Sequence, residues 1–170
     1  DTIQAGLMIF ALLLTPVVVV LSFADMNQIT LALEAARPQA TDVIGNLSFV
    51  AIISLLAWGL GYFGQPHILV RFMAADSVKS IPNARRIGMT WMILCLGGAV
   101  AAGFFGIAYF QQHPELAGAV TANPETVFME LTKILFNPWI AGIVLAAILA
   151  AVMSTLSCQL LVCSSTLTED

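Results

Sequence analysis

Long apolar stretches alternate with short polar ones along the whole chain. The apolar stretches cover about residues 3–24, 47–72, 87–110 and 138–165. A helix of about 20 residues, rising about 1.5 Å per residue, is long enough to cross the hydrocarbon core of a bilayer. The pattern therefore predicts an all-α integral membrane protein with four transmembrane helices in a single transmembrane region over residues 1–170.

Composition agrees with a membrane protein. Hydrophobic residues make up 59% of the 170 residues and charged residues only 9%, whereas about 25% of the residues of a soluble domain are charged. The net charge of −4 is spread thinly and leaves no basic stripe, so no nucleic-acid partner is expected. The chain begins with neither an initiator methionine nor a basic leader. We therefore expect it to be an internal piece of a longer protein.

The charges between the apolar stretches predict the orientation in the membrane. Four of the six basic residues lie in or beside the loop 73–86, and basic loops favour the cytoplasmic side. The loops 25–46 and 111–137 are acidic and are expected to be external. Arg71 and Asp76, near the inner surface, are candidates for an ion pair that anchors or gates that end of the helix.

Asparagine and proline residues mark where several helices should begin. Asn46 is placed to cap the second apolar stretch, and Asn137 with Pro138 should start the fourth. A further helix over about 124–135 has one apolar face, which predicts an external helix lying on the bundle or in the interface. A short surface helix is also expected over Ile29–Ala36.

Two features predict how the helices pack. Pro16 should kink the first span, since its ring displaces one backbone hydrogen bond. In the third span, Gly97, Gly98, Gly103 and Gly106 give a side of small residues against which another helix can pack closely.

The three cysteines do not form a metal motif or a disulfide in the predicted topology. Cys95, Cys158 and Cys163 all lie in apolar stretches. The last two are five residues apart on one predicted helix, which holds their Cα atoms beyond the limit of about 7 Å for a disulfide. We expect free, buried thiols, and the sequence contains neither a CxxC nor an HExxH motif.

The second apolar stretch is interrupted where a transmembrane helix should be continuous. Residues 58–66 read Trp-Gly-Leu-Gly-Tyr-Phe-Gly-Gln-Pro, which places Gly59, Gly61, Gly64 and a proline at membrane depth. Non-helical backbone is tolerated there where it is buried in protein or lines a cavity, and in transporters such breaks hold the substrate. The alternative is that the glycines serve close helix packing alone.

Three side chains recur every four residues through this break and share one helix face: Trp58, Tyr62 and Pro66. Trp58 lies near the middle of the bilayer rather than at its interface, so an aromatic belt is a poor explanation. We interpret the face as one wall of a substrate pocket. Backbone N–H and C=O groups freed by the break can bind the carboxylate and ammonium of a zwitterion.

A second candidate site lies in the fourth span. The carbonyl of Ala151 and the hydroxyls of Ser154 and Thr155 can converge on one point of a helix, and neutral oxygens suit a hard cation such as Na⁺. The alternative is that these hydroxyls bond back to the carbonyl one turn earlier. A serine hydrolase built on Ser154 and His67 lacks any supporting motif, so we do not expect an enzyme.

The motifs together resemble the sodium:solute symporter family, in its proline-transporting bacterial members. The resemblance covers nearly all 170 residues and is carried by residues 58–67, 71–76, 84–86, 136–142 and 150–165. It implies part of a LeuT-like transporter bundle with a five-plus-five inverted repeat. The first span would be the last helix of the first repeat, and the next three would open the second repeat.

The resemblance also implies a function. The parent protein would be a symporter that couples sodium flow to import of L-proline by alternating access in the bacterial inner membrane. Na⁺ is its coupling ion, and no organic cofactor is expected. Its other partners would be the lipid bilayer and the remaining helices of the full-length transporter. Alternatives are a sodium-coupled transporter of another small solute, or a structural or channel-forming helix bundle that transports nothing.

Residue roles carry over from the resemblance position by position. Trp58, Tyr62 and Pro66 would belong to the proline site, with Gly59, Gly61 and Gly64 beside it. Ala151, Ser154 and Thr155 would form half of the sodium site, and Cys158, one turn after Ser154, would lie close to it. The other sodium ligands would come from the first repeat's broken helix, which lies outside this chain.

Overall fold

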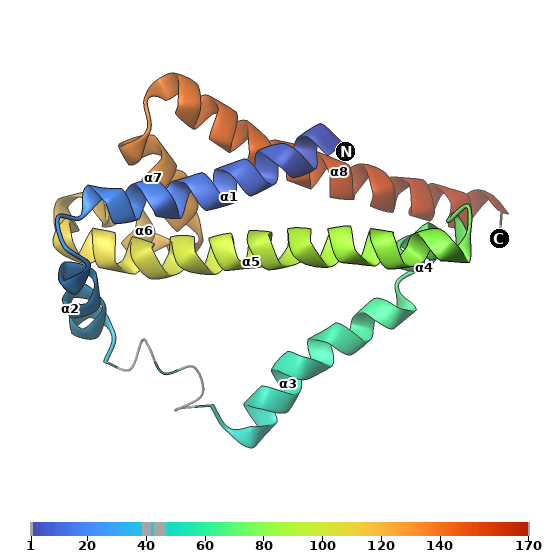
Figure 1. The fold of residues 1–170 in the computed structure, drawn as a ribbon, viewed down its shortest axis with the longest axis horizontal. Helices are drawn as coiled ribbons and strands as arrows, with labels where there is room; N and C mark the ends of the chain where they lie inside the picture. Colours follow the sequence, from blue (N-terminus) through green and yellow to red (C-terminus); the bar gives the residue numbers. More distant parts are fainter. Residues whose placement is uncertain (1, 39–41, 43–46, 170) are drawn as a thin grey trace. The chain divides into compact units, whose positions relative to one another are not determined.

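A computed structural model describes residues 2–38, 42 and 47–169, apart from the side chains of Phe63, His67 and Glu169. Within these residues every regular element is helical (Figure 1). The chain divides into two compact units: Asp1–Thr41 with Thr90–Val152, and Asp42–Met89 with Met153–Asp170. The two longest helices, α5 (Ile81–Gln112) and α8 (Pro138–Glu169), contribute to both units.

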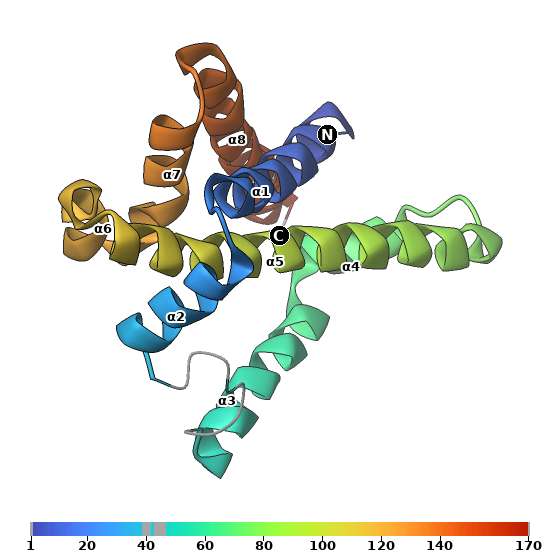
Figure 2. The same ribbon diagram turned by 60° about the vertical axis from the view of Figure 1, so that its left-hand side comes forward.

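In the first unit, α1 (Thr2–Ser22) packs along α5 (Figures 1 and 2). The contact is close at Gly98, because a Cβ added there would lie 2.7 Å from the carbonyl oxygen of Leu12. Near one end, the indole Nε1 of Trp91 donates to the carbonyl of Ala5 at 3.4 Å. The expectation that a glycine of the third span permits close packing is therefore met at Gly98.

Pro16 explains why Gly98 faces this particular carbonyl. Proline has no N–H, so the carbonyl of Leu12, one turn earlier, has lost its normal helical donor. A glycine opposite allows the neighbouring backbone to come close to the exposed oxygen, where Cα–H groups are weak donors. The adjacent hydroxyl of Thr15, fully buried, donates to the carbonyl of Ala11 at 3.0 Å. The backbone of α5 thus packs against the carbonyl that Pro16 leaves without a donor.

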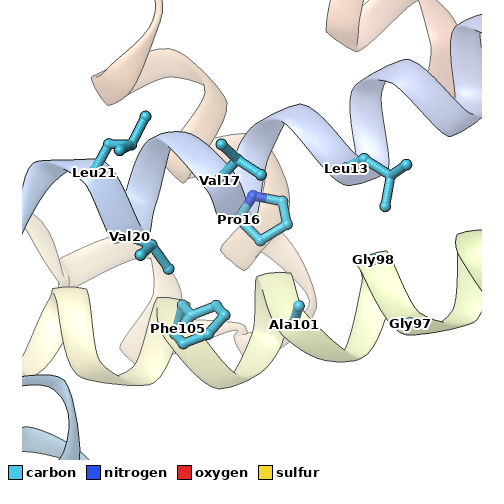
Figure 3. Close-up of a pocket in the computed structure, with 9 residues that line it drawn as sticks. All are labelled: Leu13, Pro16, Val17, Val20, Leu21, Gly97, Gly98, Ala101 and Phe105. Atoms are coloured by element: carbon cyan, nitrogen blue, oxygen red, sulfur yellow. The ribbon is translucent and has the colours of Figure 1, made fainter. Parts of the chain in front are cut away.

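Beside this contact a groove of about 320 Å³ runs between α1 and α5 (Figure 3). No charged or hydroxyl-bearing side chain lines it, so it offers nothing to orient a polar solute. It is lined by Leu13, Pro16, Val17, Val20, Leu21, Gly97, Gly98, Ala101 and Phe105. Gly97 has open space around its Cα, unlike its neighbour Gly98.

Shorter helices close one end of the first unit. α2 (Met26–Ala36) begins earlier than predicted, because the carboxylate of Asp25 caps it by accepting the N–H of Asn27 at 3.2 Å. Its buried residues pack against Ala108 of α5. After η3 (Pro114–Leu116), α6 (Gly118–Ala122) and η4 (Pro124–Thr126), the sequence-predicted helix over 124–135 is present as η4 followed by α7 (Val127–Leu135).

α7 packs onto the first unit through its apolar face. Leu131 is completely buried in a cluster with Val19, Tyr109 and Phe110. A Cβ added to Gly106 would lie 2.7 Å from a methyl group of Val127, so this glycine also serves close packing. The other two glycines named from the sequence, at positions 97 and 103, meet nothing within 4 Å.

The start of α8 follows the predicted pattern. The side chain of Asn137 accepts the N–H of Ile140 at 3.0 Å, and Pro138 is the first helical residue. Val144 and Ala147 are buried with Ala11 of α1. This first half of α8 is therefore held by apolar packing.

The second unit contains the interrupted stretch. α3 (Phe49–Leu60) is followed by η1 (Gly61–Gly64), α4 (Pro66–Met73) and η2 (Val78–Ser80). The predicted cap Asn46 lies outside the described residues. Ser48 caps α3, because its hydroxyl accepts the N–H of Ala51 at 3.2 Å.

Three helices of the described chain are long and apolar enough to cross a membrane: Thr2–Ser22, Val78–Gln112 and Pro138–Thr168. The third predicted span thus begins as a helix before residue 87, since Pro82 is tolerated in a first helical turn. In the remaining stretch, Phe49–Leu60 is a shorter apolar helix. The predicted count of four spans stays a prediction.

The packing at Gly98 gives a stability test with a matched control. In the full-length protein, Gly98→Ala should lower the free energy of unfolding by about 1–3 kcal/mol, because the added methyl group meets the Leu12 backbone. The neighbouring Gly97→Ala has room for its methyl group and should be neutral or slightly stabilising. Thermal unfolding in detergent measures both, and equal midpoints for the two variants would contradict the close contact.

Candidate substrate and sodium half-sites

The predicted interruption of the second stretch is present in the structure. α3 gives way to the single 3₁₀ turn η1, and Gln65 then adopts an extended conformation with φ −88° and ψ 116°. Pro66 has no N–H, so the carbonyl of Tyr62 lacks its helical donor; the N–H of Gln65 reaches it instead at 3.4 Å. The carbonyl of Gln65 accepts the N–H groups of Ile68 and Leu69 at 3.0 and 3.2 Å, and a new helix starts.

The aromatic face lies beside this break. The rings of Trp58 and Tyr62 pack edge to face, with centroids 5.0 Å apart and planes at 79°. Trp58 is 73% exposed and Tyr62 42% exposed, and the Tyr62 hydroxyl has no hydrogen-bond partner among the described residues. Pro66 is exposed at the first position of α4. The structure brings the two aromatic residues together and places the proline just after the break.

The three glycines of the break do not serve packing against any described residue of this chain. A Cβ added to Gly59, Gly61 or Gly64 would meet nothing within 4 Å. At Gly98 and Gly106, by contrast, an added Cβ would meet neighbouring atoms at 2.7 Å. No described residue packs closely against the glycines of the break, so the alternative that they serve helix packing has no support within the described chain. In the third span, by contrast, two glycines do serve close packing.

Hydroxyls in the second half of α8 differ in whether they have a partner, and Thr155 and Ser165 are among those that have one. Ser157 donates to the carbonyl of Met153 at 2.8 Å, and Thr166 and Thr168 likewise bond back to a carbonyl one turn earlier. These residues follow the alternative in which helix hydroxyls satisfy their own backbone. Ser154 is half-buried, and its hydroxyl has no hydrogen-bond partner in the described part of the chain. Its oxygen is thus left available to a ligand.

One side-chain contact joins α4 to the second half of α8. The guanidinium Nη2 of Arg71, in α4, lies 4.0 Å from Sγ of Cys158, in α8. Cys158 is one helical turn after Ser154, so both side chains project from the same side of α8. The second half of the broken helix therefore faces the side of α8 that carries Ser154. Ala151 and Thr155 lie on the same uninterrupted helix.

The expected ion pair of Arg71 is not present among the described residues. Its expected ion-pair partner was Asp76, but its contact in the structure is Cys158. The signal in the sequence was a cation next to the last residue of the second apolar stretch, but its partner depends on where the break redirects α4.

The cysteine expectations are partly right. All three thiols are free, as predicted. Cys95 is buried, Cys158 is half-buried and Cys163 is exposed in this chain, so the expectation of buried thiols is wrong for Cys163. Among the described residues no cluster of three or more His, Cys, Asp and Glu side chains could hold a metal ion.

Comparison with known proteins decides the family. The profile of the sodium:solute symporter family matches residues 1–170. The chain belongs to the sodium:solute symporter family. Family membership and the long apolar helices together make it a membrane-embedded, multi-pass, all-α protein.

Individual relatives of this symporter-family chain are named as proline transporters. It is 68% identical to the sodium/proline symporter of Escherichia coli strain K12 over 170 residues, all of this chain and 34% of the relative. It is 49% identical to a high-affinity proline transporter of Bacillus subtilis strain 168 and 45% identical to an osmoregulated proline transporter of the same strain, again over its whole length. The chain spans about one third of the length of these relatives. No solved structure matches it significantly.

Cross-linking tests the approach of α4 to α8. In the full-length protein with Cys95→Ala and Cys163→Ala, Arg71→Cys should be joined to Cys158 by a short bis-maleimide, because the native side chains are in contact. A protease site inserted after the exposed Glu115 reads out the link, since joined fragments stay together after cleavage. The matched control pairs Arg71→Cys with Cys163 instead, with Cys158→Ala, and should link poorly because Cys163 lies on another side of α8. Equal yields would contradict the arrangement.

Proposed function

We propose that this chain is part of a symporter that imports L-proline with Na⁺ by alternating access across the bacterial inner membrane. The observation that carries the proposal is the interrupted helix α3–η1–α4, whose second half meets the hydroxyl-bearing side of α8. The names of the relatives, which include sodium/proline symporters, give the substrate and the ion.

The substrate half of the site would act through backbone and aromatic groups. Proline at neutral pH is a zwitterion with a compact apolar ring. The N–H and C=O groups freed at the break can bind its carboxylate and ammonium without a buried formal charge, as at the broken helices of other transporters. The adjacent rings of Trp58 and Tyr62 offer apolar surface to the pyrrolidine ring, and Pro66 ends the break.

The sodium half of the site would use neutral oxygens of α8. Three ligands are proposed: the carbonyl of Ala151 and the hydroxyls of Ser154 and Thr155. The half-buried hydroxyl of Ser154, which has no partner in the described chain, supports the assignment of this one ligand, because a side chain already bonded to its own helix has less to offer a cation. Further ligands would come from a helix outside this chain. An ion held there would stabilise one state of the transporter and so couple its binding to that of proline.

The wider architecture follows from the same proposal. The four predicted spans would be part of a LeuT-like five-plus-five bundle, with the loop 73–86 cytoplasmic and the loops 25–46 and 111–137 external. Proline and sodium cross without any covalent step, so no catalytic residue and no organic cofactor belong to the mechanism. The lipid bilayer and the remaining helices complete the protein.

Sodium dependence of uptake tests the α8 site. In full-length protein in proteoliposomes, Ser154→Ala and Thr155→Ala should each raise the sodium concentration for half-maximal proline uptake about tenfold, because losing one polar ligand costs about 1–2 kcal/mol. Ser157→Ala is the matched control, since its hydroxyl is bonded to the carbonyl of Met153. If all three variants keep the wild-type sodium dependence, Na⁺ does not bind at this part of α8.

Proline affinity tests the aromatic wall. Tyr62→Ala should weaken sodium-dependent proline binding about tenfold, because it removes an aromatic ring that is expected to contact the substrate. Tyr62→Phe keeps the edge-to-face contact with Trp58 and should lose less. Equilibrium binding of labelled proline to purified protein, at matched insertion levels, distinguishes them. An unchanged proline affinity in Tyr62→Ala would show that this residue serves helix packing and does not contact proline.

A further inference from the structure

Basic side chains gather at the corner between α4 and α5 in the second unit. Lys79 lies in η2, and Arg85 and Arg86 lie near the start of α5. All three are exposed, and none forms an ion pair with a described residue. The single carboxylate of this corner, Asp76, is exposed as well and pairs with none of them. The corner therefore carries a net positive charge in a chain whose net charge is −4.

Large apolar side chains stand among these cations. Met73 is 83% exposed, Val78 is 81% exposed and Ile87 is 72% exposed. Val78 directly precedes Lys79, and Ile87 directly follows Arg86, so an exposed apolar residue adjoins a basic one at two points of the corner. A site for a small soluble anion has no need of exposed apolar residues. Cations interleaved with apolar residues are typical of protein surface that sits in the headgroup region of a membrane.

We infer that residues 73–87, called here the basic corner, bind the headgroup of an anionic phospholipid. Lys79, Arg85 and Arg86 contact its phosphate, and Met73, Val78 and Ile87 lie against the upper part of its acyl chains. Charge complementarity selects this partner: a negatively charged leaflet attracts basic groups at its surface, and guanidinium groups suit phosphate geometry. This inference concerns the membrane partner of the chain and does not depend on the transported solute.

The position of the basic corner gives such a lipid a mechanical role. The corner connects α4 to α5 through η2. Arg71, two residues before the corner, is engaged with Cys158 of α8 and so is not counted among the lipid-binding cations. A lipid bound at the corner would hold the C-terminal end of α4 in place, and the break at Gln65 lies at the N-terminal end of the same helix.

Lipid-dependent stability tests the inference. Full-length protein in detergent is titrated with phosphatidylglycerol, and its thermal midpoint is followed. Phosphatidylglycerol should raise the midpoint of the wild type, and phosphatidylethanolamine at the same concentration should not. The variant Lys79→Gln/Arg85→Gln/Arg86→Gln should need far more phosphatidylglycerol, since each surface cation contributes about fivefold in affinity. Arg37→Gln, which removes one exposed cation of the α2 end, is the control and should respond as the wild type does.

Two further measurements test whether the stabilisation by phosphatidylglycerol is electrostatic and whether it requires the acyl chains. Raising the salt concentration should weaken the response of the unaltered protein to phosphatidylglycerol, because exposed charges are screened. This measurement uses the wild type, so a folding defect in a variant cannot affect it. Soluble glycerol phosphate should not replace the lipid, since it lacks acyl chains. The inference is overturned if the triple variant responds like the wild type, if phosphatidylethanolamine stabilises equally, or if glycerol phosphate gives the full effect.

Discussion

Backbone hydrogen bonding in lipid is the constraint on which this structure depends. A peptide group that loses its helical partner at membrane depth must find protein, water or a ligand instead, because hydrocarbon offers none. Two prolines of the described chain create this situation inside apolar stretches. Pro16 leaves the carbonyl of Leu12 without its donor, and Pro66 does the same to Tyr62.

The two prolines have different outcomes. At Pro16 the helix continues, and α5 presents Gly98 so closely that a Cβ would lie 2.7 Å from the exposed oxygen. At Pro66 the helix ends in a 3₁₀ turn, and the glycines around it have open space. The same loss of a helical donor is therefore met by close packing of α5 in one helix. In the other it is met by a tight turn, where the N–H of Gln65 reaches the carbonyl of Tyr62 at 3.4 Å and two aromatic rings lie alongside.

Local chemistry is what the sequence predicts well. The break, the asparagine cap at position 137 and the helix over about 124–135 all depend on residues within one turn, and all are observed. Partners set by tertiary geometry were not predictable in this way: Arg71 contacts Cys158 because α4 is redirected at Gln65. Nor could the sequence tell Ser154 from Ser157, since a serine hydroxyl bonds back or not according to its rotamer.

That difference between neighbouring serines links the constraint to the proposed function. Two hydroxyls already have a partner in their own helix: Thr15 donates to the carbonyl of Ala11, and Ser157 donates to the carbonyl of Met153. Groups without a partner in the described chain, such as the hydroxyls of Ser154 and Tyr62, lie in the second unit on the helices where ion and substrate are proposed to bind. In a membrane an unsatisfied polar atom is costly, so these hydroxyls need a partner from outside the described chain: another helix of the full-length protein or, as proposed above, a bound ion or solute.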